Sequence, residues 1–178
     1  MSVPDFSINA DDVAKDLAGG GQPSDAQSLE AAQTSDRLLD GRIAAGQSVI
    51  VETVLSSGKH KARVLRAQSA GFKFVLVYVA VRIPELNVAR VALRFAKGGH
   101  DVPQERIRAR RERSHELFGW FARMADDVYV FDNSSAVPST AAVKQTSGWR
   151  LPNLDLLPPD LAATIRSIAA GQIPPPQE

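Results

Sequence analysis

Apolar positions follow two kinds of pattern along the chain. Continuous apolar runs at residues 48–53 (SVIVET) and 72–81 (FKFVLVYVAV) predict strands, and the β-branched run at 48–53 is typical of a strand buried on both faces of a parallel sheet. Shorter strands are expected at 5–8 and at 127–133 (DVYVFDN), the second being the last strand of the chain. Residues 134–156 are turn-rich and show no clear period.

Between these strands, apolar residues recur at helical spacing, and Ser, Asp, Pro and Gly mark where each helix starts or stops. The expected helices begin at Asp11 or Asp12, at Ser24 or Asp25, and at Lys59, Pro84, Pro103 and Pro158. Strands that alternate with helices indicate an α/β sandwich around a mostly parallel sheet. A length of 178 residues with 44% hydrophobic residues fits a single domain, residues 1–178.

Composition excludes several classes of function. The formal net charge is +1, from 21 basic and 20 acidic residues, so no overall field would hold the chain on nucleic acid or on an anionic membrane. Cysteine is absent and His60, His100 and His115 show no metal-binding spacing, so no metal site is expected. The first residues lack signal-peptide features, and the longest apolar run is too short to span a bilayer. We expect a cytoplasmic protein.

Polar residues gather where the predicted strands end, which is where open α/β sheets bind ligands. Asn9 and Asp11 follow the first strand, and Asp11 or its neighbour Asp12 is either a helix cap or a carboxylate that acts as a general base. Glu52 ends an apolar strand and is expected to emerge at the crevice, because a buried unpaired charge is costly. Thr53 follows as a hydroxyl ligand or as an ordinary turn residue.

The segment RIRARRER contains five arginines on one predicted helix. At about 100° per residue, Arg111 lies near the apolar stripe that contains Ile107 and is expected to face inward, whereas Arg106, Arg108 and Arg113 are expected to face solvent. Glutamates are interspersed among the arginines, and the chain as a whole is not basic. Nucleic-acid binding is therefore the weakest interpretation of this helix.

An inward arginine needs an anion, either a buried carboxylate or a bound phosphate. Arg94 lies on the preceding predicted helix, so Arg94 and Arg111 are placed to bracket one phosphate. The alternative is that both arginines form structural salt bridges to Asp132 or Glu52. The spacing leaves these two interpretations open.

Taken in order, the motifs INADD, ETVLS, LRFAKGGHDVPQERIRARRERS and VYVFDNS resemble the zeta-toxin-like family of P-loop kinases and predicted ATPases over about residues 5–135. The resemblance implies a P-loop-kinase-like sandwich with a C-terminal extension at 136–178. It also implies ATP and Mg²⁺ as cofactors, a small-molecule phosphoryl acceptor such as a hydroxyl of a UDP-activated amino sugar, and an antitoxin as protein partner.

The resemblance also implies roles for individual residues. Asp11 corresponds to the catalytic base, and Glu52 and Thr53, together with Asn9, correspond to the substrate-binding position. Arg94 and Arg111 correspond to the arginines placed on the ATP phosphates. Near the nucleotide, the resemblance places Asp132 and Asn133.

The family's first strand and its phosphate loop, GxxxxGK[ST], have no counterpart in the printed sequence, which has seven residues before Ile8. In the family this strand lies between those corresponding to 48–53 and 72–81. Three explanations are open: the protein starts further upstream, the chain is a degenerate relative, or another chain donates the strand. Two functions are therefore expected as alternatives. The protein is either an ATP-dependent kinase or a non-catalytic pseudokinase or partner-binding relative that has lost ATP binding.

Overall fold

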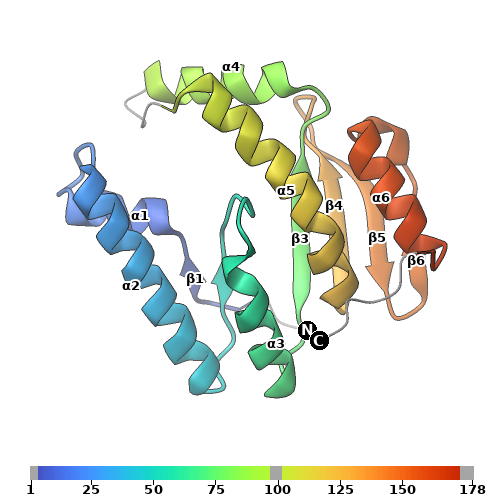
Figure 1. Cartoon of the computed structure of the whole chain (residues 1–178), viewed down its shortest axis with the longest axis horizontal. Coiled ribbons are helices and arrows are strands. Elements are labelled where there is room, and N and C mark those ends of the chain that lie inside the picture. Colours follow the sequence, from blue (N-terminus) through green and yellow to red (C-terminus); the bar gives the residue numbers. More distant parts are fainter. Residues whose placement is uncertain (1–3, 97–101, 173–178) are drawn as a thin grey trace.

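The computed structural model describes residues 4–96 and 102–172 and places six strands in two sheets (Figure 1). The smaller sheet pairs β1 (Ser7–Ile8) with β2 (Ile50–Val51) in parallel. The larger sheet has the order β3 (Val75–Ala80), β4 (Asp127–Asp132), β5 (Ser139–Gln145), β6 (Gly148–Arg150). In the larger sheet β3 and β4 are parallel, and β5 and β6 add antiparallel pairs.

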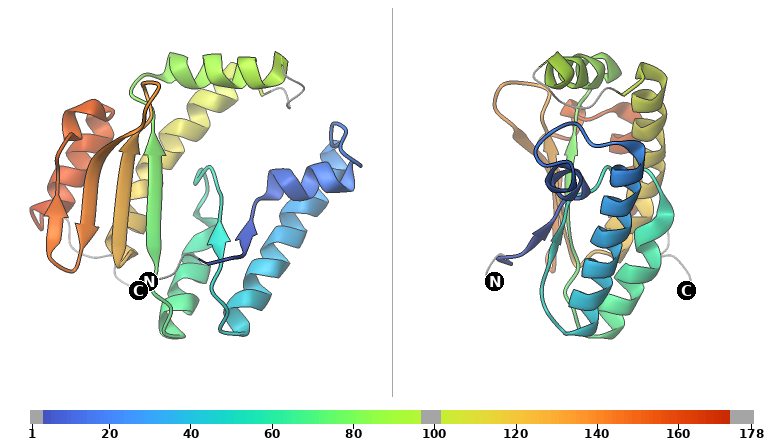
Figure 2. Two further views of the ribbon diagram at one scale, coloured as in Figure 1. Left: turned by 180° about the vertical axis from the view of Figure 1, so that it is seen from behind. Right: turned by 90° about the vertical axis from the view of Figure 1, so that its left-hand side faces the viewer.

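Six α-helices surround these strands in the described part of the chain. They are α1 (Ala10–Leu17), α2 (Asp25–Ala44), α3 (Lys61–Ser69), α4 (Pro84–Ala96), α5 (Gln104–Met124) and α6 (Pro159–Ala169). Two short 3₁₀ turns, η1 (Gly58–His60) and η2 (Leu154–Leu156), complete the secondary structure. Helices α2, α3, α5 and α6 lie on the same side of the strands (Figure 2). The predicted α/β class is confirmed.

Local sequence explains where the long helices begin. Ser24 caps α2 through the backbone N–H of Gln27, whose side chain bonds back to Ser24, so the two residues form a capping box. Pro103 and Pro158 stand immediately before α5 and α6, and Pro159 is the first residue of α6. No helix among the described residues is long and apolar enough to cross a membrane.

The expectation for residues 134–156 was wrong, because this segment contains β5 and β6. Strand β5 carries the small residues Ala141 and Ala142, both fully buried, so its burial depends on close packing rather than on a strong apolar period. The hairpin turns at residues 146–147, and β6 then starts at Gly148, whose φ of 100° suits glycine and strains other residues. The β4–β5 pairing also shifts register between Val130 and Phe131, which further weakens the period.

Complete burial of the strand at 48–53 was also wrong. Only Ile50 and Val51 are assigned to the strand, and Ile50 is 38% exposed. The physical reason is that β2 belongs to a two-stranded sheet with α2 and α3 on one side of it (Figure 2), so it lacks the cover on both faces that strands of a full parallel sheet have.

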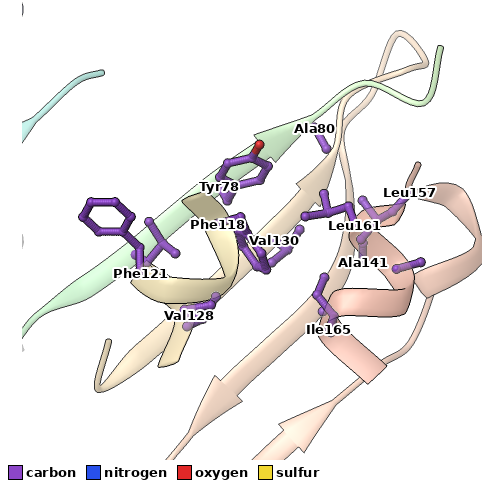
Figure 3. Close-up of a cluster of buried hydrophobic side chains, with 14 of the residues drawn as sticks. Tyr78, Ala80, Phe118, Phe121, Val128, Val130, Ala141, Leu157, Leu161 and Ile165 are labelled. Atoms are coloured by element: carbon purple, nitrogen blue, oxygen red, sulfur yellow. The ribbon is translucent and has the colours of Figure 1, made fainter. Parts of the chain in front are cut away.

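The main core lies between the larger sheet and helices α5 and α6 (Figure 3). Phe118 and Phe121 from α5 are almost completely buried, and the rings of Tyr78 and Phe118 meet edge-on at 4.8 Å. Leu161 and Ile165 from α6 are fully buried on the same face. This core fixes β3 and β4 relative to α5, the helix that carries the five arginines of residues 106–113.

Candidate functional site

The four parallel strands β1 to β4 point toward the same end of the molecule, where α4 also lies (Figures 1 and 2). Two groups of predicted site residues gather at their carboxyl ends. The first strand-end cluster, after β1 and β2, consists of Asn9, Asp11, Glu52 and Thr53. The second strand-end cluster, after β3 and β4, consists of Arg82, Arg111, Asp132, Asn133 and Ser134.

In the first cluster, the structure brings Asn9 and Glu52 into direct contact. Ile8 pairs with Val51, and the Glu52 backbone N–H donates to the Ile8 carbonyl at 2.9 Å, so the next residue, Asn9, lies beside Glu52. Asn9 Nδ2 donates to Glu52 Oε2 at 2.8 Å. A carboxylate and a carboxamide therefore stand together at the end of two adjacent strands.

The cap of α1 is Asn9, so the expectation that Asp11 or Asp12 fills that role was wrong. Asn9 Oδ1 accepts the Asp11 backbone N–H at 2.9 Å. Asp11 and Asp12 are exposed within the first helical turn, where the helix dipole favours negative charge. Asp12 lies 4.0 Å from Lys15, whereas the Asp11 carboxylate has no ion pair among the described residues. Asp11 is thus a solvent-accessible carboxylate held at a helix amino end.

Thr53 begins a tight turn, in agreement with the second of the two interpretations that the sequence left open for it. Its Oγ1 accepts the Leu55 backbone N–H at 3.1 Å. Leu55 has a φ of 54°, which is uncommon outside glycine, and its side chain is buried in the main core. The Ser56 carbonyl then accepts Arg113 Nε at 3.2 Å. These contacts hold the loop after Glu52 at both of its ends. Arg113 is exposed, as predicted, but it also contacts this loop.

In the second cluster, Asp132 is 4% exposed and ends β4. Its Oδ1 accepts the Ser134 hydroxyl at 2.5 Å and the Ser134 backbone N–H at 3.2 Å. The Ser134 hydroxyl oxygen in turn accepts the Arg82 backbone N–H at 2.8 Å, and the Asn133 backbone N–H donates to the Ala80 carbonyl at 2.8 Å. These bonds tie the segment after β4 to the segment after β3.

Arg111 faces inward as predicted, but its partners are neither carboxylates nor any other anion. Its Nη2 donates to the carbonyls of Val81 and Arg82, each at 3.2 Å, while its Nε is buried without a hydrogen-bond partner. Among residues 4–96 and 102–172, it forms no ion pair with Asp132 or Glu52. The salt-bridge alternative for Arg111 is therefore wrong, and the protein partners of its guanidinium are backbone carbonyls.

Arg94 lies near the carboxyl end of α4 and is exposed. Its neighbours Leu93 and Phe95 are 63% and 47% exposed, so this end of α4 is loosely covered by the described part of the chain. No ion pair of Arg94 occurs among the described residues, so the salt-bridge alternative is not seen for it either. His100 lies outside the described residues.

Neither cluster is enclosed. One hollow on the described surface is lined by residues 151–156 and Arg166, and another by Tyr129, Thr140, Val143 and residues 150–152; neither hollow includes a residue of the two clusters. No group of three or more His, Asp or Glu side chains that could hold a metal ion occurs in the segments that the structure describes. The first cluster offers the exposed carboxylates of Asp11 and Glu52, whereas the second combines the buried carboxylate of Asp132 with the guanidinium groups of Arg82 and Arg111.

A model of the zeta toxin family matches residues 13–140. The match includes Glu52, Thr53 and the whole second strand-end cluster, and it begins just after Asn9 and Asp11. Comparisons with curated proteins and with solved structures found no match. Because the family match spans well over half of the 178 residues and contains the strand ends, the chain belongs to the zeta toxin family.

Proposed function

We propose that this protein is an ATP-dependent phosphotransferase of the zeta-toxin type, which transfers a phosphoryl group to a hydroxyl of a sugar nucleotide. The observation that carries the proposal is the family match over residues 13–140, a range that contains the carboxyl ends of β2, β3 and β4. Open α/β sheets bind ligands at these ends. Phosphoryl transfer depends mainly on positioning and on charge neutralisation, for which carboxylates and arginines are suited.

The first strand-end cluster supports a role in binding and deprotonating the acceptor. Glu52 and Thr53, with Asn9 beside them, offer acceptors and donors to sugar hydroxyls. Asp11 is exposed at the amino end of α1 and has no ion pair among the described residues, so its carboxylate is free to accept a proton from an acceptor hydroxyl. The cluster thus contains both a base and groups that orient the hydroxyl.

The second strand-end cluster supports a role on the nucleotide side. ATP with Mg²⁺ supplies the transferred phosphoryl group when bound. Arg111 places a positive charge beside the segment that follows β3, and such a charge favours the binding of a phosphate group. Asp132 and Asn133 lie at the end of β4 beside the segment that Arg111 holds, and helix α4, which carries Arg94, lies at the same end of the molecule (Figure 1).

A phosphate-binding segment could be donated at the unpaired edges between the two sheets. Among the described strands, β2 pairs only with β1, and β3 pairs only with β4. On β3, Val77 and Val79 are 60% and 56% exposed, although parallel strands are usually covered on both faces. A strand followed by a helix would pair with the free edge and cover these valines. This arrangement favours a strand donor, either a further segment of the protein or a partner.

A titration of ATP and Mg²⁺ into the 178-residue chain tests the nucleotide side. A rise in the thermal midpoint is expected, and Arg94→Ala should reduce it, because Arg94 is exposed and its loss removes no contact within the described fold. Arg106→Ala, also exposed, serves as the matched control and should leave the rise unchanged. No rise at millimolar ATP, with the chain folded, would count against catalysis by this form.

A second candidate function is that of a non-catalytic relative that binds a protein such as an antitoxin. It is favoured by the internal partners of Arg111 and Asp132, which already hold these side chains without a nucleotide. The ATP titration separates the two candidates, because a folded chain that binds a protein partner but no nucleotide supports the second.

A further inference from the structure

Asn9 uses both ends of its carboxamide. Its Oδ1 accepts the Asp11 backbone N–H at 2.9 Å, and its Nδ2 donates to Glu52 Oε2 at 2.8 Å. Only one orientation of the carboxamide satisfies both neighbours, because an N–H group requires an acceptor and a carboxylate requires a donor. The Asn9 side chain therefore connects the amino end of α1 to the carboxylate at the end of β2.

Glu52 needs such a connection in order to hold one position. Its side chain is exposed, and a long exposed glutamate samples several rotamers. Among the described residues, Asn9 is the partner that holds its carboxylate. The backbone ladder fixes the two residues side by side, since the Glu52 N–H donates to the Ile8 carbonyl.

We propose that Asn9 is a positioning residue, which fixes the Glu52 carboxylate relative to α1 and Asp11 and does not itself contact the phosphoryl acceptor. This inference rests on the proposed function, in which Glu52 binds the acceptor and Asp11 accepts its proton. Each polar atom of the Asn9 side chain already has one protein partner, so the carboxamide cannot turn toward a substrate without losing the cap of α1 or the contact with Glu52. Asn9 thus determines the separation between the base and the acceptor-binding carboxylate.

Substitutions at position 9 can separate the capping role from the positioning role. Asp and Ser cap helices about as well as Asn, so Asn9→Asp and Asn9→Ser keep the cap of α1. Asn9→Asp places a second carboxylate against Glu52, and Asn9→Ser replaces the Nδ2 donor with a hydroxyl on a shorter side chain. In the double variant Asn9→Asp/Glu52→Gln, the hydrogen bond returns with donor and acceptor exchanged.

One arm of the test needs no ligand. In NMR spectra of the wild-type chain, the side-chain NH₂ signals of Asn9 should shift on Glu52→Gln and stay in place on Glu112→Gln, a change at another exposed glutamate. Thermal midpoints of Asn9→Asp and Asn9→Ser should stay within about 3 °C of the wild type, because the cap is kept. Asn9 signals that are insensitive to Glu52→Gln would overturn the inference, whatever the protein binds.

The second arm measures binding of a UDP-activated amino sugar by calorimetry. Asn9→Asp should weaken binding about tenfold and Asn9→Ser less, and the double variant should recover part of the loss relative to Asn9→Asp. In an assay with ATP, KM for the sugar should rise while KM for ATP is unchanged. Wild-type affinity in Asn9→Asp would overturn the inference. If the wild type itself binds no sugar nucleotide, the proposed function fails, and the NMR arm alone decides the role of Asn9.

Discussion

Arg111 is an inward cation that the fold uses to hold backbone carbonyls. Its Nη2 binds the carbonyls of Val81 and Arg82, which follow β3 and have left the sheet ladder. We predict that Arg111→Ala lowers the free energy of unfolding by about 1–3 kcal/mol, because two partly buried acceptors lose a charged donor. Urea denaturation followed by circular dichroism measures this loss.

Two further variants make the Arg111 measurement specific. Arg111→Lys keeps the charge but loses the planar fork, so an intermediate loss of stability is expected. Arg106→Ala on the exposed side of the same helix should change stability by less than about 0.5 kcal/mol. If Arg111→Ala is as mild as Arg106→Ala, the carbonyl contacts do not stabilise the fold.

At the residue scale, the sequence predicted where the site residues lie better than it predicted which groups they contact. Helical spacing placed Arg111 inward, and the rule for strand ends placed Asn9 and Glu52 together. The partners of Arg111 are backbone carbonyls, which have no side-chain signature in a sequence. The cap at Asn9 was missed because three possible cap residues, Asn9, Asp11 and Asp12, offer several registers for the start of α1, and only the β1–β2 ladder selects one.

At the scale of elements, the pair Arg63 and Asp40 links α3 to α2. Arg63 Nε and Nη2 donate to the two oxygens of Asp40, each at 2.9 Å, and Arg66 adds a further contact to the same carboxylate. The hydrogen bonds from Arg63 lower the pKa of the Asp40 carboxyl, although partial burial opposes this shift. This pair helps to hold the helix that follows the smaller sheet.

We predict that Asp40→Asn costs about 1 kcal/mol of stability at pH 7, a value reduced by the partial exposure of the pair. The folded pKa of Asp40 is lowered, so its stabilising effect is complete above the unfolded value of about 3.9 and is lost as the pH falls through the folded value. The difference between the wild type and Asp40→Asn should therefore shrink below about pH 4. Denaturation from pH 7 to pH 2.5 measures it.

Glu30→Gln is the matched control for this measurement, because Glu30 lies on the same helix and is exposed without an ion pair among the described residues. Its stability difference from the wild type should be small and should vary little with pH in the same range. A difference for Asp40→Asn that persists unchanged at pH 2.5 would contradict an electrostatic role of the pair.

The helices and the parallel strands were predictable because period, caps and flanking glycines and prolines agree locally. The hairpin β5–β6 was not, because its burial comes from α6 packing on small residues such as Ala141 and Ala142. Its strand pairs also include a register shift at Val130. Such elements are specified by tertiary contact rather than by their own pattern.

At the scale of the whole molecule, the direction of each β3 backbone group can be assigned. The Phe74 carbonyl accepts the Asp126 N–H at 2.9 Å, and the Ala80 carbonyl accepts the Asn133 N–H at 2.8 Å, so even-numbered residues of this strand face β4. Backbone groups alternate along a strand. The backbone N–H groups of Val77 and Val79 therefore point away from β4, toward the edge that has no strand partner among the described residues.

We predict that, in the 178-residue chain, the backbone amides of Val77 and Val79 exchange with deuterium at least about 100-fold faster than those of Leu76 and Tyr78. The four residues lie in one strand, so a difference between them reports hydrogen bonding rather than general unfolding. NMR-detected exchange at neutral pH resolves the four amides individually. Leu76 and Tyr78 serve as internal controls, since both are paired with β4.

Donation of a strand to this edge changes the exchange pattern in a defined way. When a partner or a longer chain supplies the strand, Val77 and Val79 should slow to the rate of Tyr78, while Leu76 and Tyr78 change little. Slow exchange of Val77 and Val79 in the chain alone, at concentrations where it is monomeric, would contradict the separation into two sheets. If that slow exchange appears only at high concentration, two copies pair through β3, and the edge serves self-association instead of a phosphate-binding strand.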